Sequence, residues 1–285
     1  MRAKPLLTAL LAPGLLGLGP VDPAAAARAR AAATAVSVDY GIMLAGVPIG
    51  TAQMTGAIEG TRYKMDVTAK LTGLVGAITG GYGAGRSAGQ VAGRPVPGSF
   101  AVASHSSSTS ITVRMALTRG NVVAAEITPP LLVDPERVPV EASAKRAVVD
   151  PVSALLMPAQ GRGDLIDPEN CNRVIPVFDG ASRFDVILSY GETRRVEKPG
   201  YAGPVLVCNA RYKPIAGHRP DKPGVKFMED NTDMSVWLAP VEGARVLLPL
   251  RISVRTQLGT NIIEATRWTQ TGAGAPPTQA AAVAQ

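Results

Sequence analysis

The stretch Arg62-Tyr63-Lys64-Met65-Asp66-Val67-Thr68-Ala69-Lys70-Leu71 alternates polar and apolar side chains residue by residue. A period of two places the apolar side chains on one face of a β-strand and the polar ones on the other. The same period returns at residues 183–190, where Ile187 is the one break, and at residues 250–258. We therefore expect a sheet with one dry face and one wet face.

Weaker strand patterns accompany these three segments. They cover residues 36–44, 100–103, 110–117, 122–127, 205–212, 234–238 and 262–268. Turn sequences such as Arg119-Gly120-Asn121 and Gly259-Thr260-Asn261 separate them. Many short strands at this spacing favour an antiparallel sheet or barrel. One domain is expected, because about 235 residues is a common size for a single large barrel.

One short helix is predicted near residues 150–157. Asp150 is a good N-cap residue and Pro151 suits the first helical position. The Gly-rich stretch 73–98 is expected to be mostly loop, with a weaker helical alternative at residues 69–78. The predicted fold class is mainly β, as a single curved antiparallel sheet or half-open β-barrel with one short helix near 150–157.

The composition excludes several classes of protein. The 285 residues include 30 Gly and 24 Pro, which are costly inside helices and argue against a helical bundle. The net charge of +7 is spread along the chain. The closest basic pairs, Lys145-Arg146 and Arg194-Arg195, have acids nearby, so no nucleic-acid interface is expected. The two Cys and two His lack the paired spacing of a zinc finger, so we expect no metal and no cofactor.

Residues 1–27 have the features of a cleaved secretory signal peptide. A positive start is followed by an apolar stretch at residues 5–19 and by small residues at 22–27. The apolar stretch is shorter than the roughly 20 residues that a membrane span needs. We therefore expect a periplasmic protein with no transmembrane segment in its mature chain. Its expected parts are a flexible lead-in at 28–35, a β-rich domain at 36–270 and a disordered tail at 271–285.

Cys171 and Cys208 are the only two cysteines. An exported chain meets oxidising conditions, where an even cysteine count favours pairing, so a structural disulfide is predicted. Two free buried thiols are the plain alternative. A redox or metal pair is disfavoured, because the spacing is far from C-x-x-C.

Two motifs around Ser87 resemble catalytic or nucleotide-binding signatures. Residues 85–89 match G-x-S-x-G, the nucleophile elbow of serine hydrolases, and residues 83–88 match G-x-G-x-x-A. The elbow needs a helix after the serine, and the dinucleotide fingerprint needs a strand before it and a helix after it. Neither context is predicted here, so a chance match in a Gly-rich loop is favoured.

The two histidines lie in different surroundings. His105 belongs to a polar run that indicates a loop or solvated edge, so a bystander role is favoured. His218 lies in the compact turn sequence 214–220, next to Arg219 and close to Arg211 and Tyr212. Since histidine titrates near neutrality, we take His218, Arg211, Tyr212 and Arg219 as candidate functional residues. A hydrogen-bonded structural role for His218 remains the plainer interpretation.

Three groups of residues, in this order and spacing, resemble the exported bacterial family called domain of unknown function 3108. The first comprises Asp150-Pro151-Val152-Ser153-Ala154-Leu155, Cys171 and residues 177–180 and 183–185. The second comprises Gly200-Tyr201-Ala202-Gly203-Pro204, Cys208 and residues 211–212 and 214–220. The third comprises Val236-Trp237-Leu238-Ala239-Pro240 and residues 248–254 and 258–260. The resemblance covers roughly residues 36–268. It implies a β-rich protein of the Gram-negative envelope with a cystine, and it brings no activity and no catalytic residue.

The leading functional hypothesis is a non-enzymatic periplasmic protein. Its concave apolar face would bind a lipid or other envelope ligand, or an envelope protein partner. The plain alternative is that residues 150–157 and the loops fill that face. A hydrolase that uses Ser87 or His218 and an envelope scaffold without a small ligand are the rival hypotheses.

Overall fold

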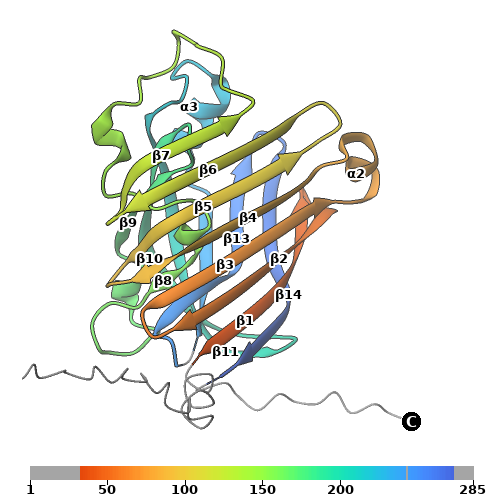
Figure 1. Ribbon diagram of the computed structural model, residues 1–285. Helices are drawn as coiled ribbons and strands as arrows, with labels where there is room; N and C mark the ends of the chain where they lie inside the picture. Colours follow the sequence, from red (N-terminus) through yellow and green to blue (C-terminus); the bar gives the residue numbers. More distant parts are fainter. Residues whose placement is uncertain (1–32, 242, 273–285) are drawn as a thin grey trace, which may run out of the picture.

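The computed structural model describes residues 33–241 and 243–272. They form one antiparallel sheet of fourteen strands, which confirms the predicted fold class (Figure 1). The strands are β1 (Thr34–Leu44), β2 (Val47–Glu59), β3 (Arg62–Leu71), β4 (Tyr82–Val91), β5 (Pro95–His105), β6 (Ser110–Thr118), β7 (Asn121–Thr128), β8 (Met157–Pro158), β9 (Arg173–Phe178), β10 (Arg183–Lys198), β11 (Tyr201–Ala216), β12 (Met234–Val241), β13 (Val246–Thr256) and β14 (Gly259–Thr271). Between them lie the helices α2 (Gly73–Thr79) and α3 (Pro223–Asp230) and the 3₁₀ turns η1 (Ala142–Lys145), η2 (Ser153–Leu155) and η3 (Pro168–Asn170).

The sheet is an open path whose two edge strands are β7 and β9. Its order is β7-β6-β5-β4-β3-β2-β1-β14-β13-β12-β11-β10-β9, with β8 paired to β13. Residues 148–149 join the two edges. The Val148 amide donates to Gly120 O in the β6–β7 turn over 2.8 Å, and the Val149 amide donates to Pro176 O of β9 over 2.8 Å. The fold is therefore a half-open barrel whose gap is bridged by a loop.

The interior is filled by the segment 148–157, which we call the plug. Its side chains Val148, Val152 and Leu156 are buried in the main core. That core also contains Val38 and Met65 from the first half of the sheet and buried residues of β13. The apolar face predicted from the alternation is thus covered by the chain itself.

The predicted helix at 150–157 forms only in part. Asp150 stabilises the turn, because its Oδ1 accepts from the amides of Val152 and Ser153, both over 2.9 Å, but the N-cap position of η2 is Val152 and not Asp150. Of the predicted helix, only the three residues of η2 form a 3₁₀ helix. The chain leaves as β8, which pairs with β13, and this pairing ends the helix before a second turn.

The expectation that residues 73–98 are mostly loop is wrong. The stretch contains α2, all of β4 and the start of β5. β1 begins at Thr34, inside the expected lead-in, and β14 runs to Thr271, inside the expected tail. The predicted signal peptide at 1–27 and the tail beyond residue 272 lie outside the described residues.

Candidate functional site

Small residues on the inner face of β4 make room for the plug. Gly83, Gly85, Ser87 and Gly89 occupy alternate positions of this strand. A Cβ added at Gly85 would lie 3.1 Å from Cγ2 of Val152, which is closer than an ordinary contact. Gly85, which belongs to both catalytic-looking motifs, therefore has a packing role against the plug.

Four polar side chains meet where β4 touches the plug. Ser87 Oγ lies 2.8 Å from Asp150 Oδ2 and 2.7 Å from Ser153 Oγ. The Ser153 hydroxyl donates to Asp150 Oδ2 over 2.5 Å, and Tyr63 Oη lies 2.6 Å from Ser153 Oγ. All four side chains are buried. Burial raises the pKa of Asp150, although the hydrogen bonds from Ser153, Ser87 and Val152 oppose the rise.

The structure does not bring Ser87 and a histidine together. Ser87 is mid-strand, 2% exposed, and its polar neighbours are Asp150, Ser153 and the carbonyl of Ser99. His105 stacks on Tyr82, and its Nδ1 lies 2.7 Å from Ser110 Oγ. Since a hydrolase needs an accessible nucleophile beside a base, this geometry gives the Ser87 hypothesis no support.

A cavity of about 310 Å³ opens beside the free edge of β9. The β4–β5 turn, the plug and the start of β9 enclose it. Its walls are mixed, and their apolar members are Val149, Ala154, Leu156, Met157, Val174 and Ile175. Its volume falls at the small end of the range for small-molecule sites, about 300 to 1,000 Å³. Two arginines, Arg94 and Arg173, also line it, and we call it the arginine cavity.

Neither arginine of this cavity has a carboxylate partner among the described residues. Arg173 donates from Nη1 to Pro158 O over 3.0 Å and from Nη2 to Asn170 Oδ1 over 3.4 Å. Its Nε is buried and makes no hydrogen bond. Burial lowers the pKa of Arg173. Arg94 donates from Nη1 to the carbonyl of Ala147 over 3.2 Å. Arg94 is exposed, whereas Arg173 is half-buried. A half-buried guanidinium without an anion is unusual, because burying a charge is costly unless it is paired.

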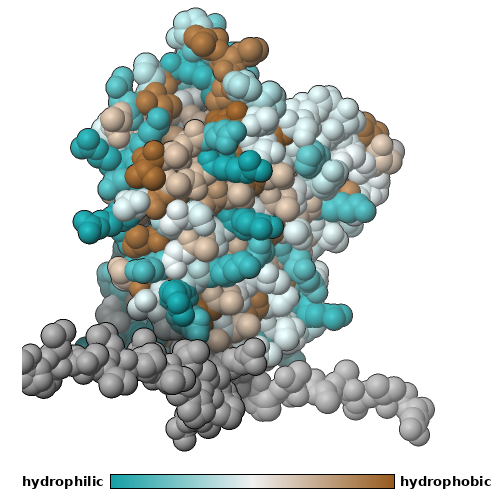
Figure 2. All heavy atoms as spheres, in the orientation of Figure 1, coloured by the Kyte–Doolittle hydropathy of each residue, from teal (hydrophilic) through white to brown (hydrophobic). Residues whose placement is uncertain are grey.

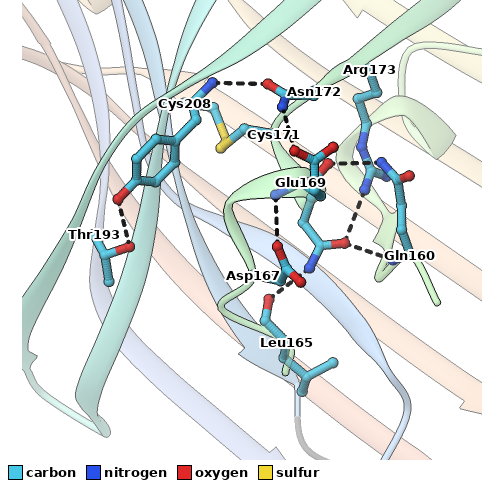
Figure 3. The surroundings of a disulfide bond; sticks show 11 residues. Gln160, Leu165, Asp167, Glu169, Cys171, Asn172, Arg173, Thr193 and Cys208 are labelled. Atoms are coloured by element: carbon cyan, nitrogen blue, oxygen red, sulfur yellow. Dashed lines mark hydrogen bonds between the residues drawn. A yellow bond between two sulfur atoms is a disulfide. The ribbon is translucent and has the colours of Figure 1, made fainter. Parts of the chain in front are cut away.

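The disulfide holds one wall of the cavity in place. Cys171 and Cys208 are bonded, with their Cα atoms 5.4 Å apart, which is the pairing that the sequence predicts. Cys171 follows η3 and stands two residues before Arg173 (Figure 3). Asn170 adds a second fixed point, because its Oδ1 accepts from the Gln160 amide over 2.6 Å. The start of β9 is thus tied to β11 and to the segment after the plug.

The candidate residues around His218 lie elsewhere, at the end of β11. His218 O and Gly217 N bond the backbone of Val138 over 2.9 and 2.8 Å. Arg219 contacts Asp134, and Arg137 donates to Gly217 O over 2.7 Å. These bonds fasten the segment after β7 to the turn after β11.

The other two candidates are packed beside this turn. Tyr212 packs its ring on Phe184, with centroids 5.3 Å apart. Arg211 donates to Glu229 O at the end of α3 over 3.2 Å. Burial raises the pKa of Tyr212, and the charges of Asp179 and Glu229 add to the rise. A functional role for His218, Arg211, Tyr212 and Arg219 stays a prediction.

A wider groove of about 720 Å³ runs over β1 to β4. Its charged side chains are exposed or already paired: Lys70 is exposed, and Asp39 accepts a hydrogen bond from Gln53 over 2.9 Å. It has no desolvated charge, so the arginine cavity is the better candidate. Within residues 33–241 and 243–272, no group of three or more His, Cys, Asp and Glu side chains could hold a metal ion. No helix in that part of the chain is long and apolar enough to cross a membrane.

The sequence gives little signal for the arginine cavity. Arg94 and Arg173 are single basic residues 79 positions apart, and β9 shows only Val174, Ile175 and Val177 around Pro176. The one available hint is the position of Arg173 two residues after a cysteine expected to be in a disulfide. Only the structure shows that neither arginine has a carboxylate partner among the described residues.

Fold and site together define a half-open antiparallel barrel with a filled interior and a small cavity at its open edge. The chain belongs to the family described as "Protein of unknown function (DUF3108)", whose family model matches residues 36–266. The resemblance noted from the sequence is confirmed. A search of the curated proteins finds no match.

Two solved structures show similarity to the chain. One is described as a beta-barrel-like protein of domain of unknown function DUF1849 from Brucella abortus, at 9% identity and a TM-score of 0.45. The match covers 84% of this chain and 98% of that one. The other is described as "a putative lipoprotein from Parabacteroides distasonis", at 7% identity and a TM-score of 0.30, covering 82% and 94% of the two chains.

Proposed function

We propose that this protein is a non-enzymatic, exported binding protein of the cell envelope that holds a small anionic amphiphile in the arginine cavity. The observation that carries the proposal is the pair Arg94 and Arg173, which line a partly apolar cavity of about 310 Å³ with no carboxylate partner among the described residues. A guanidinium recognises a carboxylate or phosphate through two parallel hydrogen bonds. The apolar part of the walls suits a short hydrocarbon chain.

Export is supported by the signal-peptide pattern at residues 1–27 and by the disulfide. Disulfides persist in oxidising compartments such as the bacterial periplasm. The ligand hypothesis from the sequence placed a lipid on the concave face of the sheet. Since the plug covers that face, the proposed ligand lies at the open edge of the barrel instead.

Isothermal titration with three ten-carbon probes tests the proposal. Decanoate and decyl phosphate carry an anionic head, and decanol has the same chain without the charge. We expect the anions to bind and decanol to bind at least about tenfold more weakly, since a hydrogen bond to a charged group contributes about 1.5 to 3 kcal/mol. A preference between the two anions assigns the head as carboxylate or phosphate.

Two variants locate the binding. Arg173→Gln should weaken the anions about tenfold or more and leave decanol unchanged. Arg245→Gln is the matched control, because Arg245, like Arg173, has no carboxylate partner in the part of the chain that the structure describes. It donates to the carbonyls of Gly161 and Gly163 and does not line the cavity. No binding of any probe, or equal binding by wild type and Arg173→Gln, contradicts the proposal and favours a scaffold without a small ligand.

A further inference from the structure

Three consecutive large apolar side chains are exposed just after β7. Leu131 is 45% exposed, Leu132 is 89% exposed and Val133 is fully exposed. We call these three residues the tip. Figure 2 shows apolar atoms at the top of the molecule, where Figure 1 places the loop after β7 and α3. Single exposed apolar residues are common on protein surfaces, but a run of three on a projecting loop is not.

More exposed apolar side chains lie at the same end of the sheet as the tip. Because the path is antiparallel throughout, the turns after β1, β3, β5, β7, β11 and β13 share one end. We call it the tip end. Of the twelve exposed large apolar residues that the described chain contains, nine lie at this end. Beside the tip these are Val47, Ile78, Tyr82, Ile111, Ile215 and Leu258.

The tip is held rigidly at its base. Val138 is bonded to the backbone of Gly217 and His218, and Arg137 donates to Gly217 O over 2.7 Å. Asp134, directly after the tip, contacts Arg219, and its Oδ2 lies 3.6 Å from Arg137 Nε. Desolvation raises the pKa of Asp134, but the hydrogen bond and charge of Arg219 and the amide of Glu136 outweigh it, so this pKa is lowered. The acid nearest the tip is therefore kept charged and paired.

We propose that the tip end docks onto a lipid bilayer, with Leu131, Leu132 and Val133 inserted among the acyl chains. A protein partner needs a contiguous complementary patch, whereas the apolar side chains here come from separate turns: three from the tip and one or two from each of the others. A bilayer accepts such a convex, discontinuous rim, because the acyl chains adapt to its shape. Arg137 and Arg219, which pair with Asp134, would lie at the level of the lipid phosphates.

The arginine cavity lies at the other end of the sheet, since the β4–β5 turn that lines it is opposite the tip end. A docked molecule would present this cavity away from the bilayer. Docking and amphiphile binding are thus separate properties, and either can fail without the other.

Co-sedimentation of the full chain with phosphatidylcholine vesicles, with and without one quarter phosphatidylglycerol, tests the docking. Wild type should sediment with both kinds of vesicle, and binding should persist at 0.5 M salt, because apolar insertion is not screened. The double variant Leu132→Ser with Val133→Ser should reduce the partition about tenfold or more. Val123→Ser, at an exposed apolar residue on β7 outside the tip end, should change nothing.

Leu132→Trp gives an independent readout of insertion. Its emission should shift to the blue when vesicles are added, and that of Val123→Trp should not. Wild type that stays in the supernatant, or a double variant that sediments like wild type, overturns the proposal. Concentration-dependent dimerisation that the double variant abolishes, without vesicle binding, would reassign the tip to self-association and likewise overturn it.

Discussion

Ser87 of β4 and Asp150 of the plug are hydrogen-bonded, with Ser87 Oγ 2.8 Å from Asp150 Oδ2 across 63 residues of sequence. The contact joins the inner face of the sheet to the segment that fills the barrel. The serine of the G-x-S-x-G motif therefore has a structural role: it fixes the plug to β4. Because the plug fills the interior, we expect a ligand to bind at the open edge of the barrel.

Removal of the Ser87 hydroxyl should destabilise the fold. Ser87→Ala leaves a buried carboxylate with one hydrogen bond fewer, and we expect the free energy of unfolding to fall by about 1 to 3 kcal/mol. Urea unfolding followed by circular dichroism measures it. Ser99→Ala, at an exposed position of the neighbouring strand β5, should stay within about 0.5 kcal/mol of wild type. Equal effects of the two variants would show that the buried cluster contributes nothing.

The raised pKa of Asp150 makes stability depend on pH. In the unfolded chain the carboxyl titrates near 3.8, and in the folded protein it titrates higher. The folded state therefore holds the proton more tightly. The contribution of Asp150 is fully present below pH 3.8 and is lost as pH rises through the folded pKa. The stability of wild type relative to Asp150→Asn should accordingly fall as pH rises over this window, and a constant difference would contradict the assignment.

The fit between Gly85 and Val152 predicts a coupled pair of substitutions. Gly85→Val should destabilise the protein by about 1 to 3 kcal/mol through overpacking against the plug. Val152→Ala in the same chain should recover part of this loss, because it removes the methyl group that an added Cβ would meet. Gly98→Val is the control, since a Cβ there meets Ala88 O only at 3.7 Å. Strictly additive effects of Gly85→Val and Val152→Ala would show that the two positions are not in contact and would contradict this packing.

The disulfide should stabilise the fold substantially. Closing a loop across 37 positions contributes about 4 kcal/mol in the chain-entropy model. The double variant Cys171→Ala with Cys208→Ala should show this loss in urea unfolding. Reductant should destabilise wild type by a similar amount and leave the variant unchanged. A wild type that is insensitive to reductant after full reduction of both cysteines would rule out this contribution.

The sequence predicts the strands whose inner face is uniformly apolar, and β3 is the clearest example. It misses β2 and β4, because Gly50, Ala52, Gly56 and the alternate glycines of β4 replace the apolar period with small residues. Gly85 leaves room for Val152 of the plug, a contact between segments about 65 positions apart, whereas Gly50 lies against the backbone of Lys70 in the neighbouring strand β3. The periodicity of a segment indicates which of its side chains share a face, but it does not indicate which distant segment packs against that face.

The candidate site shows the same limit. The disulfide follows from the cysteine count and from the oxidising compartment expected from the sequence, so the sequence predicts it. The arginine cavity depends on Arg94 and Arg173 converging from β4–β5 and β9, and on the absence of an acid between them in the described structure. His218 and Arg219 stand out in the sequence as a dense polar turn, and the structure shows them fastening the loop behind the tip.

Methyl NMR during titration with decanoate tests the central claim most directly, because it reports where the ligand lies. We expect the perturbed methyl signals to be those of the cavity walls: Val149, Leu156, Val174 and Ile175. Signals of the filled interior, such as Val38, Leu248 and Leu250, should not move. Perturbation centred on Val38, Leu248 and Leu250 would contradict the account, since it would mean that the ligand displaces the plug and occupies the concave face of the sheet.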